Sequence, residues 1–292
     1  MGRIVRCITS EGAISAIGID STDIVNEAVR IHKTSAVVSA ALGRMLTAAS
    51  MMGDMLKGAS HSLTMKLTGD GPVGSVVVAS DSSGNVRGYV VNPVVEIPLK
   101  ANGKLDVSGA VGKNGSLYVI KDIGLKEPYS GSVPLVTGEI AEDITAYYAV
   151  SEQIPTVCAL GVLVNPDLSI KAAGGYIIQL LPGAMDSDID KLEETIKHIR
   201  PVTQMLSDGM SVEEIIKTAL AGFEVEVLDE STPEYKCDCS RPRVERMLAS
   251  IDREELLSMA AEMPTIEVKC HFCDNTYNFT PAEVKSMAEK KK

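Results

Sequence analysis

Four cysteines near the end of this 292-residue chain have the spacing of a metal-binding or redox site. One residue separates Cys237 from Cys239, and two residues separate Cys270 from Cys273. Four thiolates in two close pairs match the tetrahedral, sulfur-rich coordination that Zn²⁺ prefers. We therefore predict that these four cysteines bind one Zn²⁺ ion per chain.

The ligand set argues against a catalytic metal. Catalytic zinc keeps one position open for water beside three protein ligands, whereas four cysteines close the shell. The nucleobase deaminase pattern fails as well, because Lys269 stands where proline should precede the CxxC pair. His271 lies between two ligands and is predicted to face solvent. A structural or a redox-switching zinc remains, and the chain is not expected to be an enzyme.

The same thiolates are also nucleophiles. Lys236, Arg241, Arg243 and Lys269 flank them and favour the charged form. An oxidant could convert the ligands to disulfides and expel the metal. A disulfide within the CxC pair closes a small, strained ring, and strained, exposed disulfides are the reversible kind. The zinc site could therefore act as a switch.

Composition restricts the partners and the compartment. A formal net charge of −11 argues against nucleic acid or an anionic membrane as partner. Arg6 and Glu11 interrupt any signal-like apolar run. The most apolar window, 35–56, contains Arg44 and Asp54 and is expected to be a buried helix. We expect a cytoplasmic protein, in which clustered cysteines more often bind metal or do redox work than form permanent disulfides.

Charge divides the chain near residue 183. Of the 39 acidic residues, 23 lie beyond residue 182, with only half of the 28 basic ones. We predict three parts: an N-terminal core over 1–182, a metastable helical linker over 183–234, and a redox-switch zinc domain over 235–292.

The elements of the core predict an α+β fold with a mixed, largely antiparallel sheet and packed helices. Helices are expected at 21–31, 35–57 and 139–152. Strands are expected at 3–9, 12–19, 62–68, 75–80, 86–91, 117–123, 132–138, 156–164 and 174–181.

The predicted linker and tail contain the elements that must position the cysteines. "DIDKLEETIKHI" is amphipathic, and Ser211 with Glu214 forms a capping box before the next helix. Helices of this length are marginal in water, so they need a surface to dock against. The tail combines helices at 252–263 and from 280 with a strand at 265–270.

Two glycine-rich stretches resemble nucleotide sites only superficially. In "GDGPVG", 69–74, a strand former follows the glycines where a dinucleotide site needs a helix, so we predict a hairpin turn. "GAVGKNG", around Lys113, has Asn114 where a phosphate loop needs Ser or Thr. No ATP dependence is expected. Cys7 and Cys158 lie in apolar strand patterns and are expected to be inert, buried thiols.

The residues resemble a known family over essentially the whole chain. "CDCSRPRVERML", "DREELLSMA" and "IEVKCHFCDNTYNF" are similar to the zinc domain of the heat-shock protein 33 family of redox-regulated chaperones. "GDGPVGSVVV", "YYAVSEQIPT" and "AAGGYIIQLLP" resemble that family's N-terminal domain.

This resemblance implies an ATP-independent holdase that is inactive while reduced and zinc-bound, and whose core over 1–182 binds clients and dimerises. Oxidation would form the disulfides Cys237–Cys239 and Cys270–Cys273, release zinc and unfold the tail and the linker. The exposed apolar surface would hold unfolding client proteins, and the active form would be a homodimer. Clients would pass later to ATP-driven foldase chaperones.

Two other functions remain open at this point. A zinc-ribbon regulator that binds nucleic acid is opposed by the acidic tail and by the lack of interleaved aromatic residues. A thiol–disulfide oxidoreductase using Cys270 and Cys273 would need its CxxC at a strand-to-helix junction, whereas the strand-like "TYNFT" follows here.

Overall fold

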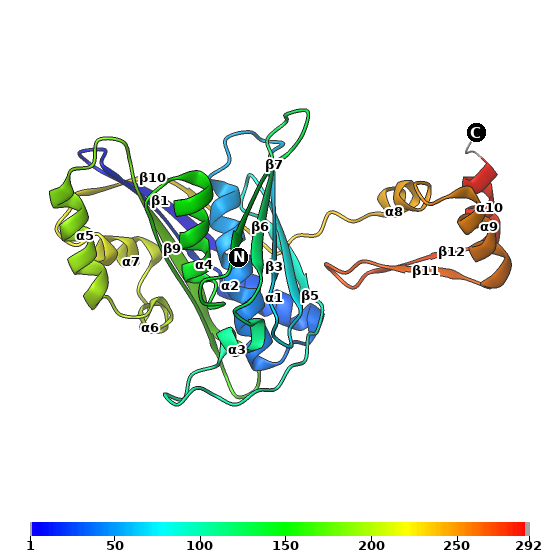
Figure 1. Ribbon diagram of the computed structural model, residues 1–292, viewed down its shortest axis with the longest axis horizontal. Helices are drawn as coiled ribbons and strands as arrows, with labels where there is room; N and C mark the ends of the chain where they lie inside the picture. Colours follow the sequence, from blue (N-terminus) through cyan, green and yellow to red (C-terminus); the bar gives the residue numbers. More distant parts are fainter. Residues whose placement is uncertain (1, 290–292) are drawn as a thin grey trace. The chain divides into compact units, whose positions relative to one another are not determined.

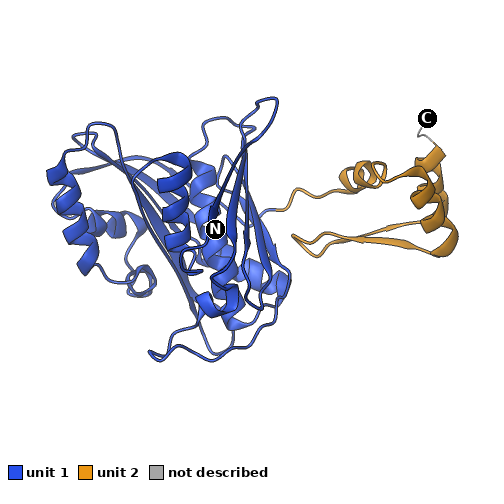
Figure 2. Cartoon of the chain, viewed as in Figure 1, with its two compact units in different colours: residues 1–236 blue, residues 237–292 orange. Residues whose placement is uncertain are grey.

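The structure is a computed structural model that describes residues 2–289. It divides into two compact units, residues 1–236 and residues 237–292 (Figure 2). The division falls between Lys236 and Cys237, so the whole cysteine cluster (Cys237, Cys239, Cys270 and Cys273) belongs to the second unit.

Two five-stranded antiparallel sheets form the frame of the first unit (Figure 1). The first sheet contains, in spatial order, β10 (Val225–Ser231), β1 (Arg3–Thr9), β2 (Ile14–Asp20), β9 (Ile170–Leu180) and β8 (Thr156–Val164). The second contains β5 (Val86–Val90), β4 (Ser75–Asp81), β3 (Ser62–Thr68), β6 (Ser116–Asp122) and β7 (Tyr129–Pro134). The predicted α+β class is confirmed, with the strands distributed over two sheets rather than one.

Helices fill the space between these sheets. The long helix α2 contacts β8 and β9 of the first sheet and β3, β4 and β5 of the second. It is long and apolar enough to cross a membrane by length and composition, but 89% of its apolar window is buried inside the structure. The expectation of a buried core helix is confirmed. The helices of this layer are α1 (Thr22–His32), α2 (Ala36–Asp54), α3 (Val107–Val111), α4 (Ala141–Tyr147) and the π-helical turn η1 (Tyr148–Glu152).

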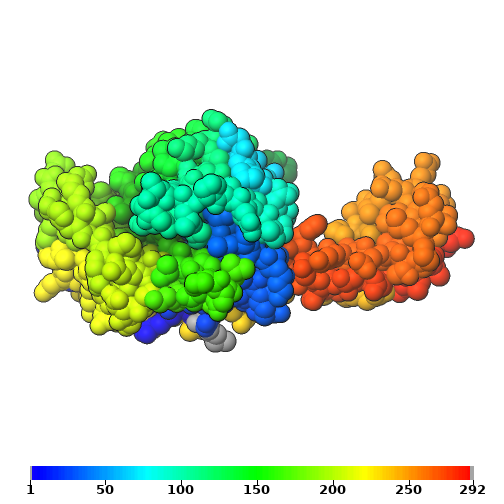
Figure 3. All heavy atoms as spheres, turned by 90° about the horizontal axis from the view of Figure 1, so that it is seen from below, coloured from blue at the N-terminus to red at the C-terminus, as the bar shows by residue number. Residues whose placement is uncertain are grey.

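Three further helices cover the opposite face of the first sheet. They are α5 (Asp186–His198), α6 (Val202–Ser207) and α7 (Val212–Ala219), which we call the linker helices. Figure 3 shows them in yellow-green as a layer of packed side chains at one end of the first unit. The capping box of α7 is confirmed, since Ser211 Oγ accepts from Glu214 N and Glu214 Oε2 accepts from Ser211 N. The predicted helical linker over 183–234 is helical only as far as α7, because Val225–Ser231 form β10 and pair with β1. That this segment is separable and metastable stays a prediction.

A second apolar cluster lies between the sheet and the linker helices. Even-numbered residues of β9 point toward the helices and odd-numbered ones toward the central core, because successive side chains in a strand alternate. Tyr176 and Ile178 accordingly pack with Met205 and Ile216, while Ile177 joins the central core. Both faces of this sheet are therefore buried, which explains the nearly continuous apolar run of β9.

The predicted hairpin turn in "GDGPVG" is confirmed, because residues 69–74 connect β3 directly to β4. Gly74 has φ +74°, a conformation that glycine adopts without strain. The Asp70 carboxylate accepts hydrogen bonds from the backbone amides of Lys113 and Asn114, at 3.0 and 3.1 Å. The two glycine-rich stretches thus bind each other, and a carboxylate occupies the amides that a phosphate would need.

The second unit is small and folds around one cluster of apolar side chains. Leu256, Phe279 and Val284 are fully buried in it, with Leu248 and Ile266 nearly so. Its β11 and β12 form an antiparallel hairpin. The elements are α8 (Arg241–Leu248), α9 (Arg253–Glu262), β11 (Ile266–Lys269), β12 (Thr276–Phe279) and α10 (Pro281–Glu289).

Candidate metal centre

Two local structures supply the four thiols. Cys237 and Cys239 lie in an extended segment that ends at Ser240, the N-cap of α8. Cys270 and Cys273 lie in the turn between β11 and β12. Two backbone hydrogen bonds close this turn, from Cys270 N to Asn275 O and from Asp274 N to Cys270 O, both at 2.9 Å. Each pair is therefore local, and tertiary folding brings the pairs together.

The four sulfur atoms converge on one point. All of them lie within 4.8 Å of one another. Across the pairs, Cys237 Sγ lies 3.7 Å from Cys270 Sγ, and Cys239 Sγ lies 3.3 Å from Cys273 Sγ. A tetrahedral zinc with Zn–S bonds of about 2.3 Å would separate its sulfur ligands by about 3.8 Å. The cluster can therefore hold a metal ion of this kind, and exposed His271 is not needed to complete it.

The surroundings of these thiols give them different pKa values. Burial raises the pKa of Cys237 to about 11 and also raises that of Cys273. Burial opposes ionisation of Cys239 too, but hydrogen bonds from Tyr277 and the neighbouring thiols outweigh it and lower its pKa to about 7. Cys239 consequently ionises before Cys237 and Cys273.

Tyr277 of β12 touches the cluster directly. Its hydroxyl donates a hydrogen bond of 3.1 Å to Cys239 Sγ. That bond raises the pKa of the phenol to about 12, so Tyr277 keeps its proton at neutral pH and remains the donor. The tyrosine was not singled out from the sequence, where a polar residue in a strand-like run gives no sign that a thiol lies opposite.

Arg241 connects the two halves of the second unit. Its guanidinium lies over the Phe279 ring, 4.4 Å from the centroid, and donates to Asn278 O at 2.9 Å and to Glu283 at 2.7 Å. These contacts join the segment that carries the CxC pair to β12 and α10. In the sequence, Arg241 is recognisable only as a positive charge near the cysteines.

Arg241→Ala is expected to weaken metal binding about tenfold. The lost cation–π contact and hydrogen bonds should destabilise the second unit by about 1–2 kcal/mol. Because folding and metal binding are coupled in small metal modules, this loss appears in the apparent affinity. Competition with a chelator measures it, and Arg246→Ala, an exposed arginine of the same helix, is the control. Equal affinities in both variants would contradict the role given to Arg241.

The two remaining cysteines lie away from the cluster. Cys7 is 1% exposed on the face of β1 beneath the linker helices, and burial raises its pKa to about 11. Cys158 of β8 packs against the central core, and desolvation raises its pKa as well. Both thiols are therefore protonated at neutral pH, as expected for unreactive cysteines.

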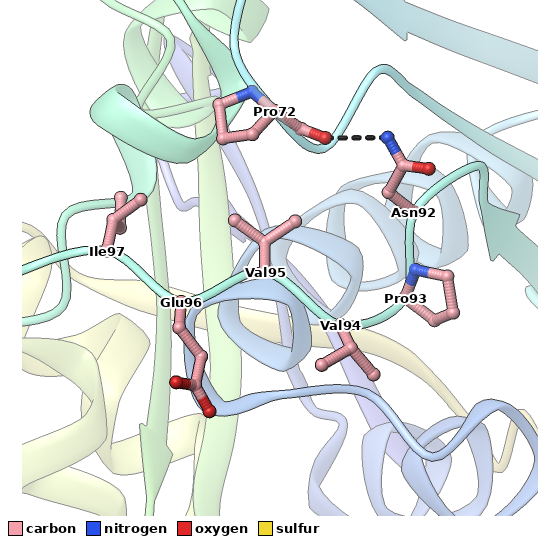
Figure 4. Close-up of a pocket in the computed structure, with 7 residues that line it drawn as sticks. All are labelled: Pro72, Asn92, Pro93, Val94, Val95, Glu96 and Ile97. Carbon is pink, nitrogen blue, oxygen red and sulfur yellow. Dashed lines mark hydrogen bonds between the residues drawn. The ribbon is translucent and has the colours of Figure 1, made fainter.

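A surface pocket of about 430 Å³ lies on the first unit (Figure 4). Its lining comes from Pro72 and the extended segment 92–97, and Asn92 closes one side by donating to Pro72 O at 2.7 Å. Glu96 is the one ionisable side chain in this lining, and in Figure 4 it points away from Pro72. A nucleophile, a base and an oxyanion donor do not meet there, so the pocket lacks the groups of an active site.

Comparisons with known proteins show the family to which the chain belongs. A model of the family described as "Hsp33 protein" matches residues 2–280. A 33 kDa chaperonin of Clostridium botulinum is 47% identical over 287 residues, covering 98% of this chain and 97% of that protein. One of Clostridium perfringens is 48% identical over 290 residues, covering 99% and 92%.

A solved structure extends the likeness to the fold. The crystal structure of the 33 kDa chaperonin (heat shock protein 33 homolog) of Thermotoga maritima matches with a TM-score of 0.89 at 34% identity. The match covers 99% of this chain and 98% of that one. With a family model spanning nearly the whole sequence and relatives of this identity, the chain belongs to the Hsp33 family of chaperones.

Proposed function

We propose that this chain is a redox-regulated, ATP-independent holdase, whose switch is a zinc centre formed by Cys237, Cys239, Cys270 and Cys273. The observation that carries the proposal is the convergence of four thiols from two separate chain segments within 4.8 Å. Bound zinc would cross-link these segments with a closed, non-catalytic shell. A holdase needs no catalytic group, so the proposed activity is non-enzymatic.

The second unit is expected to depend on that cross-link. Over its described residues, 237–289, the core contains seven buried apolar residues. Domains of this size usually need a metal, disulfides or a partner to stay folded. Structural zinc contributes on the order of 10–16 kcal/mol of apparent binding free energy, more than such a core supplies. Once its thiols no longer hold the metal, the unit should unfold.

Oxidation would remove the ligands in a balanced reaction. Four thiolates form two disulfides and give up four electrons, and two molecules of peroxide take these electrons and four protons to form four waters. We propose the pairs Cys237–Cys239 and Cys270–Cys273. The closest sulfurs in the folded unit belong to different pairs. Thiols one or two residues apart nevertheless meet more often once the unit has unfolded, because short loops close at the smallest entropic cost.

Loss of the second unit would then release the linker helices. Residues 232–236 connect β10 to Cys237, and backbone hydrogen bonds of Glu234 and Lys236 with Val86 hold this segment to the second sheet. Unfolding that passes along the chain to the linker helices would break these bonds. Removing the helices would uncover an apolar face of the first sheet, and we propose this face as the client-binding surface. Its buried residues are Val5, Cys7, Ile14, Ala16, Tyr176 and Ile178.

Several further features of the proposal come from family membership and composition. Clients are unfolded or oxidatively damaged proteins, as a chaperone of this family implies. We propose that the active form is a homodimer in the cytoplasm and that it passes clients to ATP-driven foldase chaperones. Neither nucleic acid nor membrane is a proposed partner, because the net charge of −11 opposes both.

Peroxide combined with mild heat is expected to release one zinc per chain and to suppress aggregation of a denatured client without nucleotide. A chromogenic chelator reports the released metal, light scattering reports client aggregation, and mass mapping identifies the disulfides. The same protein kept in reductant is the control. Unchanged zinc content together with full activity in reductant would refute the switch. Salt-sensitive binding of DNA or RNA, or turnover as an insulin reductase, would instead support one of the two other functions.

A further inference from the structure

A side chain of the strand β12 forms a hydrogen bond with one cysteine of the CxC pair. Tyr277 Oη donates to Cys239 Sγ at 3.1 Å, although the two residues are 38 positions apart in the chain. The bond therefore joins the hairpin that carries the CxxC turn to the opposite half of the cluster. It is the kind of outer hydrogen bond that orients a metal ligand.

Contacts that involve no cysteine hold the tyrosine in place. Tyr277 pairs with Val268 of β11 and lies on the same face of β12 as Phe279, since strand side chains alternate. Phe279 is fully buried, which fixes the face that Tyr277 presents. Arg241 lies over the Phe279 ring and donates to Asn278 O, so β12 is also tied to the segment that follows Cys239. These contacts of β12 hold the phenol beside Cys239.

A hydrogen bond to a thiolate has two chemical consequences. It fixes the direction in which the sulfur lone pairs point, which favours one coordination position. It also withdraws charge from the sulfur, so the thiolate attacks an oxidant less readily. Loss of such outer partners typically lowers metal affinity by 10–100-fold.

We propose that Tyr277 is a positioning residue of the metal centre, whose hydroxyl orients Cys239 for coordination and slows its oxidation. This inference rests on the ligand assignment in the proposed function, and it adds a residue that sets how readily the switch responds. Tyr277 acts through Cys239 and takes no part in disulfide formation itself.

Cobalt substitution tests the inference on the full-length, reduced protein. Tyr277→Phe keeps the ring, which packs against the core of the second unit, and removes only the hydroxyl. We expect about tenfold weaker Co²⁺ binding in chelator competition. At saturating Co²⁺, the thiolate-to-cobalt charge-transfer band should move to lower energy, because a sulfur without its hydrogen bond gives up an electron more easily. Tyr118→Phe, which alters an exposed tyrosine of the first unit, should leave both values unchanged.

The rate of metal release gives a second measurement. With zinc bound, Tyr277→Phe should lose its metal to peroxide several-fold faster than the wild-type chain. An unshifted charge-transfer band would overturn the inference even if affinity falls, since a purely structural loss weakens binding without changing the saturated spectrum. A wild-type chain that binds no cobalt would overturn both this inference and the proposed ligand set. A shifted band in a chain that oxidation does not activate would support Tyr277 and reject the redox switch alone.

Discussion

Cys270→Ser is expected to bind clients in reductant, without any oxidant. The substitution removes one of the four sulfur ligands. Loss of a group that only hydrogen-bonds a ligand lowers metal affinity by up to about 100-fold, so loss of a ligand itself should lower the zinc affinity by more. Because metal binding contributes on the order of 10–16 kcal/mol to folding such a module, the second unit should then be unfolded at rest. The linker helices would be released by the same path as after oxidation. Zinc content, far-UV circular dichroism and suppression of client aggregation measure the three steps.

His271→Ala is the matched control for this variant. His271 lies between Cys270 and Cys273 and is exposed, so its loss should leave zinc content and the inactive resting state unchanged. A zinc-free Cys270→Ser chain that holds no client in reductant would contradict the proposal, because metal loss would then not be coupled to client binding. Zinc loss in His271→Ala would instead place an imidazole in the shell that we propose to be all sulfur.

Gly161→Val is expected to activate client binding while the zinc stays in place. Gly161 of β8 lies beneath α6, where an added Cβ would come within 2.6 Å of Thr203 Cγ2 and 3.0 Å of Val202 Cγ1. Overpacking of this kind costs about 1–3 kcal/mol. That cost changes the docking equilibrium of the linker helices by about 5- to 150-fold. Valine suits a strand, so the sheet itself should tolerate the change better than the helix contact.

The measurement separates the linker from the metal centre. We expect normal zinc content, measurable suppression of client aggregation in reductant, and full activity at a lower dose of oxidant. Ser132→Val places the same side chain on the exposed part of β7 and should behave like the wild type. Gly161→Ala, a milder change, should give a smaller effect in the same direction. If both glycine variants match the wild type in reductant, the face beneath α6 is not the client-binding surface.

Local patterns accounted for the chemistry and for most of the elements. The spacing of the four cysteines predicted their cluster, because each pair lies within one short turn or extended segment. The capping box of Ser211 and Glu214 and the turn at 69–74 were predicted for the same reason, since they depend on residues close in sequence. The short helices α3 and α8 and the strand β10 were not predicted. Each is brief, and packing against distant residues stabilises it more than local propensity does.

Long-range arrangement was decided by the tertiary structure alone. The alternation of side chains along a strand shows which residues share a face, but it does not show which strands pair. The strands that the sequence places in one sheet therefore form two sheets in the structure. The pairing of β1 with β10 joins residues more than 200 positions apart, and the bond from Tyr277 to Cys239 spans 38. Gly161 has a role only because α6 docks against it. The sequence by itself determined the thiols and the metal they suit, whereas only packing between distant segments decided what orients Cys239 and which apolar face the linker helices cover.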